Sequence, residues 1–565
     1  MQKNLLALSL ALGLLLTLPA CSTASGSGGA SANPSASASA APTVTDATDI
    51  VLSDSGVTVD GQAASTDPAA QVFTGAAIVY YEAGHDAAYG EGTEADGHTA
   101  EEAAAHTVVT ITEPGAYRVS GTLSAGQLAV DLGEDAEEDP TAAVTLILDN
   151  ADITCTVAPA VIFYSVYECG SSDTETAAAT VDTSAAGANV ILADGSENHI
   201  TGSYVAKIYK EGTTDKLYKF DGAFYSKMSM NIYSEAEGTG NLYIVANNEG
   251  LDSELHLTIE GGNIDITADN DGINTNEDGV SVTTINSGYL TINAGLGAEG
   301  DGIDSNGYLV INGGTVITAA NPQTGDGGID SDAGIYLNGG TVLALGSRND
   351  EASADSTQTY IQLSFSSTQS EGSVISLKDS AGNEVLNSTA ARDFSSLTFS
   401  SPDLKADTTY SLYVNGVQQQ YTGHSFGMGG GMGGMGGGTP PDMGGDGQQP
   451  QFPADGELPE GAPADSTAPT DRPQRPDGAT SNGGDMTTPD AQSSASVVPD
   501  GGNAPDSSAA PGDASTADGA TRPNGGRGGG NWGGGNRDGG ESLEPSTEFT
   551  ITAETYSFSG ISAAE

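Results

Sequence analysis

Short runs of alternating apolar and polar residues recur along the chain from about residue 43 to residue 422. The clearest run, Leu257–Ile266, has apolar residues at every second position on both sides of a Gly-Gly pair. Such alternation is typical of strands with one buried face, and paired glycines permit the positive φ that a sharp corner needs. The pattern therefore predicts an all-β chain of short strands and tight corners.

This phrase returns at Leu309–Ile317 and at Ile335–Leu343. A second motif lies between these copies and beside them. It occurs at Glu249–Ser253, Asp271–Thr275, Asp301–Ser305 and Gly327–Ser331, and the apolar residue at its centre recurs at intervals of 22, 30 and 26 residues. Three short strands and three corners per unit predict one coil of a parallel β-helix, a solenoid whose coils stack through main-chain hydrogen bonds. A β-sandwich is the alternative, but the regular return of the second motif favours the solenoid, which we place at residues 43–349.

Composition divides the remainder of the chain. Residues 350–422 contain strand patterns without the repeat, and we expect a small antiparallel β module that caps the open end of the solenoid. Residues 423–545 are rich in Gly, Pro, Asp and Met and are expected to be disordered. Residues 546–565 alternate again, so we expect them to return and pair with the cap module.

The first residues have the features of an export signal. Lys3 precedes the apolar run Leu5–Leu18, and Leu18-Pro19-Ala20-Cys21 matches a lipobox, so residues 1–21 are the predicted signal peptide and Cys21 is the predicted lipidation site. Residues 22–42, rich in Ser, Ala and Gly, are the expected disordered tether. We therefore expect a lipoprotein anchored by its acyl chains at the extracellular face of the cell membrane.

Cys155 and Cys169 flank the apolar segment Val161–Tyr164. Two further thiols in an exported protein predict a Cys155–Cys169 disulfide, with two buried free thiols as the alternative.

The chain has 76 acidic and 16 basic residues, for a net charge of −60. This balance excludes nucleic acid as a partner, because nucleic-acid binding needs a basic surface. Equivalent residues of stacked coils lie about 4.8 Å apart, so the acidic residues of the repeat form ladders. Oxygen ligands in such ladders suit Ca²⁺ rather than zinc, with a purely solvated acidic face as the alternative. The predicted calcium ligands are Asp252, Asp269, Asp271, Asn274, Asp301, Asp304, Asp326 and Asp330.

Positive charge is concentrated between Lys207 and Lys227, where tyrosines are interleaved with lysines. Lysines can meet uronate carboxylates and tyrosines can stack on sugar rings, whereas the alternative is a charge-compensating loop. The predicted ligand face consists of Lys207, Lys210, Lys219, Lys227, Tyr209, Tyr218 and Tyr225. No nucleophile elbow, phosphate-binding loop or zinc-protease motif occurs, so no catalytic residue is predicted.

The two repeat motifs, together with Val109–Leu123 and Val190–Asn198, resemble the carbohydrate-binding domain-containing family of bacterial surface proteins. The resemblance covers about residues 45–420 and departs from the family in a long insert at about 64–106 and in the Gly-Met tail. It implies a right-handed parallel β-helix related in fold to polysaccharide lyases, bound calcium, and affinity for cellulose or pectic acid. It implies binding rather than catalysis.

The function expected from these features is calcium-dependent binding of a plant cell-wall type polysaccharide at the cell surface. Two alternatives are a polysaccharide lyase on the same fold and a calcium-stiffened structural or adhesive spacer. An unsaturated product formed from a polyuronate would distinguish the lyase, and failure to bind any glycan would favour the spacer.

Overall fold

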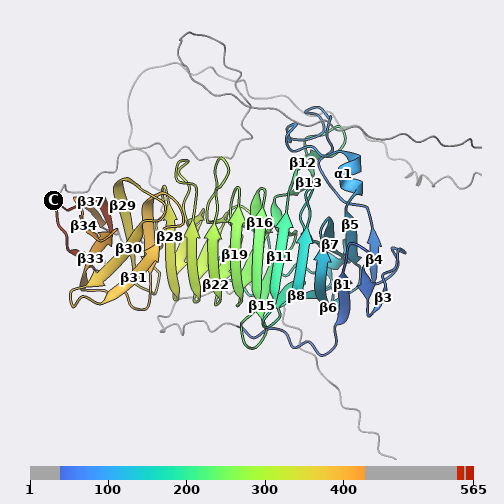
Figure 1. Ribbon diagram of the computed structural model, residues 1–565, viewed down its shortest axis with the longest axis horizontal. Coiled ribbons are helices and arrows are strands. Elements are labelled where there is room, and N and C mark those ends of the chain that lie inside the picture. The colour runs from blue at the N-terminus through green and yellow to red at the C-terminus, as the bar shows by residue number, and fades with distance from the viewer. Residues whose placement is uncertain (1–38, 427–543, 553–554, 565) are drawn as a thin grey trace, which may run out of the picture. The chain divides into compact units, whose positions relative to one another are not determined.

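The computed structural model describes residues 39–426, 544–552 and 555–564, and within these ranges the chain is almost entirely β (Figure 1). Its helical segments are short, namely α1 (Ala100–Ala104) and the 3₁₀ turn η1 (Glu134–Glu138). The all-β prediction is confirmed, and the strands form large sheets with parallel and antiparallel pairings. In the described part of the chain, no helix is long and apolar enough to cross a membrane. The predicted signal peptide, and most of the predicted tether and Gly/Pro-rich region, lie outside the described residues.

Most strands belong to three rows, in which each strand pairs with the next along the row. Row 1 is parallel apart from its antiparallel first pair, and consists of β4 (Val72–Gly75), β5 (Thr107–Ile111), β7 (Gly126–Asp131), β9 (Val161–Ser165), β14 (Gly222–Ser226), β17 (Glu249–Ser253), β20 (Ile273–Thr275), β23 (Ile303–Ser305) and β26 (Asp330–Ser331). Row 2 is parallel throughout, and consists of β1 (Thr48–Leu52), β6 (Gly115–Leu123), β8 (Val144–Thr154), β10 (Ala188–Leu192), β15 (Met230–Ser234), β18 (His256–Ile259), β21 (Val282–Ile285), β24 (Tyr308–Ile311) and β27 (Gly334–Leu337).

Row 3 starts from the end of β8 and is also parallel. It continues through β11 (Glu197–Gly202), β16 (Asn241–Ala246), β19 (Asn263–Ala268), β22 (Tyr289–Asn293), β25 (Thr315–Ala319) and β28 (Thr341–Gly346). From β9 onward the chain visits rows 1, 2 and 3 in this fixed order, so each circuit adds one strand to every row.

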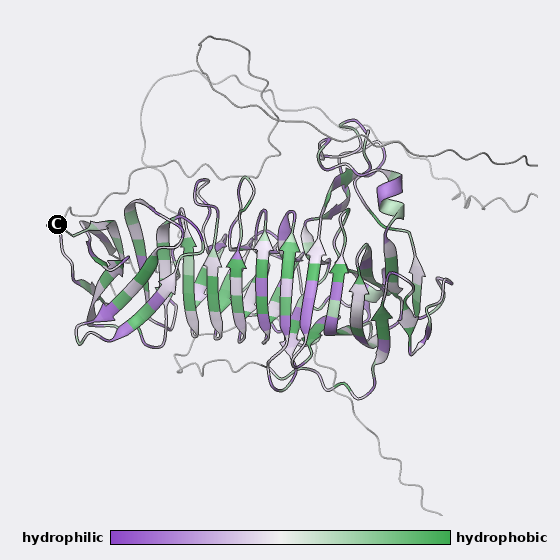
Figure 2. Ribbon diagram, viewed as in Figure 1, coloured by the Kyte–Doolittle hydropathy of each residue, from purple (hydrophilic) through white to green (hydrophobic). Residues whose placement is uncertain are grey.

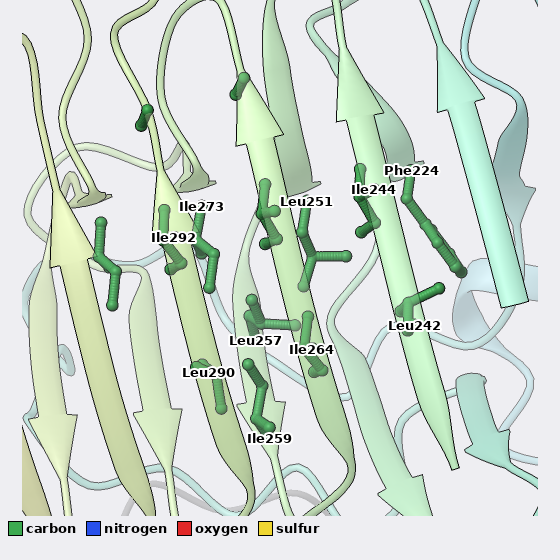
Figure 3. Packing of buried hydrophobic residues seen from close by; sticks show 14 of the residues in the cluster. Phe224, Leu242, Ile244, Leu251, Leu257, Ile259, Ile264, Ile273, Leu290 and Ile292 are labelled. Carbon is green, nitrogen blue, oxygen red and sulfur yellow. The ribbon is translucent and has the colours of Figure 1, made fainter. Parts of the chain in front are cut away.

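Apolar residues stack on apolar residues in the interior between the rows. In row 3, Leu242 pairs with Ile264 and Ile264 with Leu290, while row 1 pairs Leu251 with Ile273. These side chains are fully buried in one cluster, where Figure 3 shows them pointing into a common interior, and Figure 2 shows the alternating hydropathy along the strands. Each such buried side chain contributes about 1.5–3 kcal/mol relative to exposure, so the aligned interior stabilises all three rows.

The Gly-Gly corners lie between rows 2 and 3, as the repeat predicted. The second glycine of each pair has a positive φ: 97° at Gly262, 77° at Gly314 and 78° at Gly340. The corners also approach one another closely, because a Cβ added at Gly314 would lie 2.7 Å from the carbonyl oxygen of Gly288. Both the backbone conformation and the space at these corners therefore require glycine.

A mostly antiparallel module follows row 3. Its strands are β29 (Tyr360–Gln369), β30 (Val374–Asp379), β31 (Glu384–Thr389), β32 (Phe394–Ser400), β33 (Thr408–Val414), β34 (Val417–Gln420) and β35 (Gly423–Phe426), the last of which lies just beyond the expected end of the module. Strand β32 pairs with β28, so the module covers the last strand of row 3. The C-terminal strand β36 (Phe549–Ile551) pairs with β33. The last strand, β37 (Thr555–Ala563), pairs with β29, β34 and β35.

Two excursions leave the rows near their N-terminal end. One is the antiparallel hairpin of β12 (Val205–Tyr209) and β13 (Lys216–Phe220), inserted between β11 and β14. The other is the loop 76–106, which carries α1 between β4 and β5. Two short strands, β2 (Thr58–Val59) and β3 (Gln62–Ala63), extend the edge at β1.

The predicted Cys155–Cys169 disulfide is wrong, because Cys155 is a free buried thiol. Its side chain belongs to the apolar cluster between the rows, and burial raises its pKa to about 11. Cys169 lies outside that cluster, with its sulfur 4.0 Å from the carbonyl oxygen of Asp182. The two sulfurs therefore face different surroundings.

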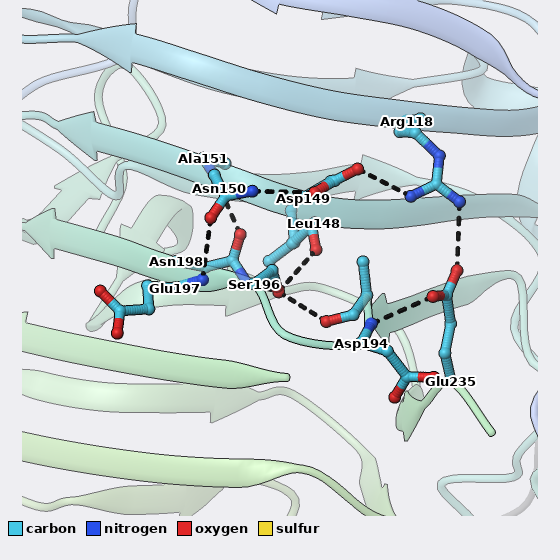
Figure 4. Close-up of polar contacts among 11 residues, drawn as sticks. Arg118, Leu148, Asp149, Asn150, Ala151, Asp194, Ser196, Glu197, Asn198 and Glu235 are labelled. Carbon is cyan, nitrogen blue, oxygen red and sulfur yellow. Dashed lines mark hydrogen bonds and ion pairs between the residues drawn. The ribbon is translucent and has the colours of Figure 1, made fainter. Parts of the chain in front are cut away.

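Polar side chains connect the turns that follow successive strands of row 2 (Figure 4). Arg118 on β6 forms ion pairs with Asp149 at 2.9 Å and with Glu235 at 3.1 Å. Asn198 accepts a hydrogen bond at 3.0 Å from the backbone N–H of Ala151, which directly follows the bulge in β8. These contacts satisfy backbone and charged groups where the ladder is interrupted.

A ladder of asparagine side chains runs along the same edge of row 2. Asn312 donates to Asn286 at 2.9 Å and accepts from Asn338 at 3.0 Å. Asn286 in turn donates to Glu260 at 3.0 Å, and Asn338 accepts from the backbone N–H of Thr357 at 3.2 Å. An amide can donate and accept at once, so one residue type satisfies every step of the ladder.

We expect Asn312→Ala to lower the free energy of unfolding by about 1–2 kcal/mol, because it removes two side-chain hydrogen bonds from the middle of this ladder. Urea titration followed by circular dichroism measures the change. The matched control is Thr315→Ala, at a half-buried position for which no side-chain hydrogen bond is found among the described residues. Equal effects of the two substitutions would show that the ladder contributes no more than ordinary packing.

Candidate functional site

Four predicted calcium ligands occupy equivalent positions of successive row 1 strands: Asp252 on β17, Asn274 on β20, Asp304 on β23 and Asp330 on β26. This is the register that the repeat predicted. Their burial differs from the expected exposed ladder, because the first three are buried and the fourth is half-buried. They alternate with core residues such as Leu251, so they point away from the core and are covered by other parts of the chain.

The corner that precedes this ladder brings two more predicted ligands together. Asp271 accepts the backbone N–H of Asp301 at 2.7 Å, and Asp301 accepts the backbone N–H of Gly327 at 2.6 Å. Both carboxyls are buried, and burial together with Asp271 raises the pKa of Asp301 to about 9. Asp326 is half-buried and accepts the N–H of Gly300 at 2.7 Å, whereas Asp269 is exposed. The structure thus leaves Asp269 outside the buried group.

Three fully buried acids converge at one end of the ladder. Asp221, Glu249 and Asp252 each place a carboxylate oxygen within 4.8 Å of the other two. Burial and mutual repulsion raise the pKa values of Glu249 and Asp252 well above their usual range. We call these three residues the acidic cluster.

Several oxygens in and beside the acidic cluster lack hydrogen-bond partners. Glu249 Oε2, Asp252 Oδ2 and Asn274 Oδ1 are buried, and no donor for them is found among the described residues. The other oxygen of Asp252 accepts from Asn276 at 2.7 Å. A buried oxygen without a donor costs about 1–3 kcal/mol, and more when it is charged, so the cluster favours positive charge.

One positive group already lies at the acidic cluster. Lys219 of β13 forms an ion pair with Asp221. Burial alone would lower the pKa of Lys219, but the neighbouring carboxylates, Asp221 first among them, raise it. A single ammonium faces three carboxyls, so the pKa values of the acids stay raised by burial in spite of it.

A cavity of about 430 Å³ lies between the hairpin β12–β13 and row 1, directly beside the acidic cluster. Its lining combines three lysines, Lys216, Lys219 and Lys227, with Tyr218 and Tyr225 and with four glutamates, Glu137, Glu168, Glu254 and Glu277. We call it the lysine cavity. Lys216 forms an ion pair with Glu254 at 3.2 Å, while Lys227 is exposed and has no ion pair within the described residues. The ammonium of Lys227 is therefore available to a bound anion.

The structure distributes the remaining residues of the predicted ligand face. Lys207 forms an ion pair with Glu91 at 2.8 Å and lies 5.6 Å from the ring centre of Tyr209. Lys210 is exposed and lies outside the lysine cavity. Tyr218 is 37% exposed and can offer a ring face. Tyr225 cannot, because it is 1% exposed and its hydroxyl contacts Glu254, so the prediction that its ring stacks on a sugar is corrected.

Three acidic residues of the site were missed from the sequence. Glu249 stands where Asp271 and Asp301 stand in the later repeats, so the repeat itself contained the signal. Asp221 directly precedes β14 and had no such signal. Glu168 lines the lysine cavity and accepts the backbone N–H groups of Gly170 and Ser229 at 2.8 and 2.9 Å, which no local pattern announces.

We expect the stability of the protein, measured with a chelator present, to fall as the pH rises from about 5 to about 9. Asp330 and Asp301 have pKa values raised to about 7 and about 9, mainly by burial. Because the pKa of each acid is higher in the folded state than in the unfolded state, protonation of the acid stabilises the folded protein. This contribution to the free energy of unfolding is complete below the unfolded pKa of about 4 and is lost as the pH rises through the folded pKa.

The measurement is the melting temperature against pH for the protein and for Asp301→Asn, which removes one buried charge and keeps an acceptor for Gly327. The substitution should flatten the curve and raise the melting temperature most at pH 9. Asp403→Asn, at an exposed position, is the matched control. Parallel curves for Asp301→Asn and the unchanged protein would contradict the expectation.

Comparison with known proteins places these features in a family. The family model described as "Carbohydrate-binding domain-containing protein" matches residues 105–170 and 170–391, just over half of the chain. A carbohydrate-binding domain-containing protein of Acetivibrio thermocellus is 30% identical over 165 residues, which are 28% of this chain and 45% of the relative. The chain thus spans less than half the length of that curated relative.

Among solved structures, the polysaccharide lyase-like protein from C. thermocellum, determined as a gadolinium derivative, is similar with 22% sequence identity and a TM-score of 0.31. The match covers 53% of this chain and 94% of that one, and the TM-score is too low to establish a common fold. Because the family model covers both the acidic cluster and the hairpin, the match includes the candidate site. The chain belongs to the carbohydrate-binding domain-containing protein family.

Proposed function

We propose that this protein binds an acidic cell-wall polysaccharide of the pectic type in the lysine cavity, with calcium held by the acidic cluster beside it. The observation that carries the proposal is Lys227, exposed and without an ion pair among the described residues, at the edge of a cavity that Lys216 and Lys219 also line. Family membership gives the class of ligand, a carbohydrate. Within the lining, the exposed ammonium of Lys227, without an ion pair among the described residues, favours a sugar that carries a carboxylate.

The lysine cavity offers both kinds of contact that a uronic acid needs. Lys227 is exposed at its edge and can pair with a carboxylate, while the partly exposed ring of Tyr218 can cover the apolar face of a sugar. Its volume of about 430 Å³ lies within the range of small-ligand sites. A neutral glycan such as cellulose would use the ring but would leave the ammonium of Lys227 without a partner.

The donors of the acidic cluster fit a calcium ion. Every group is an oxygen, the three carboxyls lie within 4.8 Å of one another, and Glu249 and Asp252 each have an oxygen without a hydrogen-bond donor. Hard oxygen ligands of this kind suit Ca²⁺, with Asn274 as a further carbonyl ligand. When bound, the ion would supply the positive charge that the buried carboxyls lack. Asp301, Asp304 and Asp330 would continue the same acidic row at a second position.

The fixed circuit through three rows supports a right-handed parallel β-helix as the architecture that holds this site. The lipobox at Cys21 supports attachment to the outer face of the cell membrane by acyl chains, with the site facing the surroundings of the cell. Cys21→Ala should move the protein from the membrane fraction to the soluble fraction of expressing cells, measured by immunoblotting. Retention of the variant in the membrane would contradict the anchor.

Binding is favoured over catalysis by the state of the polar groups in the cavity. A lyase needs a base near its operating pH to remove a proton from the uronate. Lys219 has a raised pKa because of Asp221 in spite of its burial, and burial raises the pKa of Tyr225 well above its usual range. Both groups therefore keep their protons at neutral pH.

The test is titration calorimetry with oligogalacturonate in the presence of calcium and again with a chelator. We expect binding with calcium, and Lys227→Ala should weaken it about two- to fivefold, the value of an exposed ion pair. Lys210→Ala, on the same hairpin but outside the cavity, is the matched control and should leave the affinity unchanged.

Three results would contradict parts of the proposal. Absence of heat in both conditions would remove the acidic glycan and favour a spacer. Equal affinity with and without calcium would remove the role of the ion. Equal weakening by Lys227→Ala and Lys210→Ala would move the site away from the lysine cavity.

A further inference from the structure

A second cavity, of about 730 Å³, adjoins the lysine cavity at the hairpin β12–β13. The hairpin forms one wall and the loop 76–106 forms the other, in the part of Figure 1 where α1 stands beside the hairpin. Tyrosines line both walls: Tyr80 and Tyr89 come from the loop, and Tyr209 and Tyr218 from the hairpin. We call it the tyrosine cavity.

The two walls are joined by main-chain contacts. Tyr209 donates its backbone N–H to Tyr89 at 2.8 Å, and Glu91 donates its N–H to Lys207 at 2.9 Å. The walls meet so closely that a Cβ added at Gly90 would lie 2.1 Å from the carbonyl oxygen of Lys207. The loop is therefore fastened to the hairpin, and the cavity is formed before any ligand arrives.

The lining of the tyrosine cavity carries three carboxylates and one histidine, His85, which contacts Glu82 at 3.0 Å and stacks on the ring of Tyr89. Glu82, Asp86 and Glu211 contribute carboxylates, and no lysine or arginine belongs to the lining. Apolar residues, including Ile78 and Leu217, complete the walls, and Leu217 is 45% exposed. Partly exposed apolar side chains gathered in one hollow are typical of a binding site.

This chemistry selects a sugar ring without a negative charge. Tyrosine faces cover the apolar face of a pyranose, and carboxylates accept hydrogen bonds from its hydroxyl groups. A uronate would be repelled by the same carboxylates, since like charges a few ångströms apart interact unfavourably near a protein surface. The lysine cavity differs because, besides its glutamates, it has the exposed ammonium of Lys227, which has no ion pair among the described residues.

The two cavities share a wall. Leu217 and Tyr218, at the start of β13, line both of them. We propose that the tyrosine cavity is a second glycan subsite that binds an uncharged pyranose ring, so that one polysaccharide chain crosses the Leu217–Tyr218 ridge with acidic units on one side and neutral units on the other. The proposal rests on the proposed function, because it takes the lysine cavity as the acidic subsite.

The experiment uses the whole protein with calcium present and three probes: a neutral cello-oligosaccharide, an oligogalacturonate, and a mixed oligosaccharide that contains both unit types. Tyr80→Ala should weaken binding of the neutral probe about tenfold, the upper range for loss of one ring contact, and leave oligogalacturonate unchanged. Lys227→Ala should do the reverse. The mixed probe should bind more tightly than either simple probe and should lose affinity in both variants.

Tyr289→Ala, which removes a ring that is 47% exposed on β22 and outside both cavities, is the matched control. Wild-type affinity of Tyr80→Ala for every probe, or an equal loss in Tyr289→Ala, would overturn the second subsite and leave the proposed function in place. A wild-type protein that binds oligogalacturonate but no neutral probe would do the same. Failure to bind any probe would overturn the proposed function and the inference together.

Discussion

In-register pairing of parallel strands imposes one constraint on the whole molecule: each residue has its counterpart in the next circuit at a distance of about 4.8 Å. In the interior this repetition is favourable, because Leu242, Ile264 and their equivalents pack on one another. At the edge it suits asparagine, which donates on one side and accepts on the other. For carboxylates it is unfavourable, since like charges are stacked and buried. The constraint that stabilises the core therefore also produces a row of acids that favours cations.

Much of the fold could be predicted from the sequence, because period-two alternation and glycine corners are local properties that repeat. The ladder of acidic residues and one asparagine in row 1 was predicted in the correct register for the same reason, although its burial was not. Burial depends on what covers the outer side of row 1, and Lys219, which lies near Asp252, belongs to a hairpin that is an insertion without the repeat. Lys219 and Asp221 meet through that insertion, so their pairing could not be read from spacing alone. The failed disulfide has the same origin, since no pattern shows which side of a strand end faces the core at Cys155.

Under the proposed function, the net charge of the chain raises a difficulty. A chain with a charge of −60 repels an acidic glycan at long range, and the effect weakens with salt. At short range, Lys227 offers one exposed ammonium, without an ion pair among the described residues, in acidic surroundings. The proposed binding would therefore depend on this local positive group and on bound calcium, and not on the field of the whole chain.

The pairing of β35 with β37 joins two parts of the chain that are separated by residues 427–554. The C-terminal strands β36 and β37 are consequently part of the module, although they lie far from its other strands in the sequence. Two polypeptides produced by a cut between β35 and β36 would still be held together by the main-chain hydrogen bonds of β36 and β37.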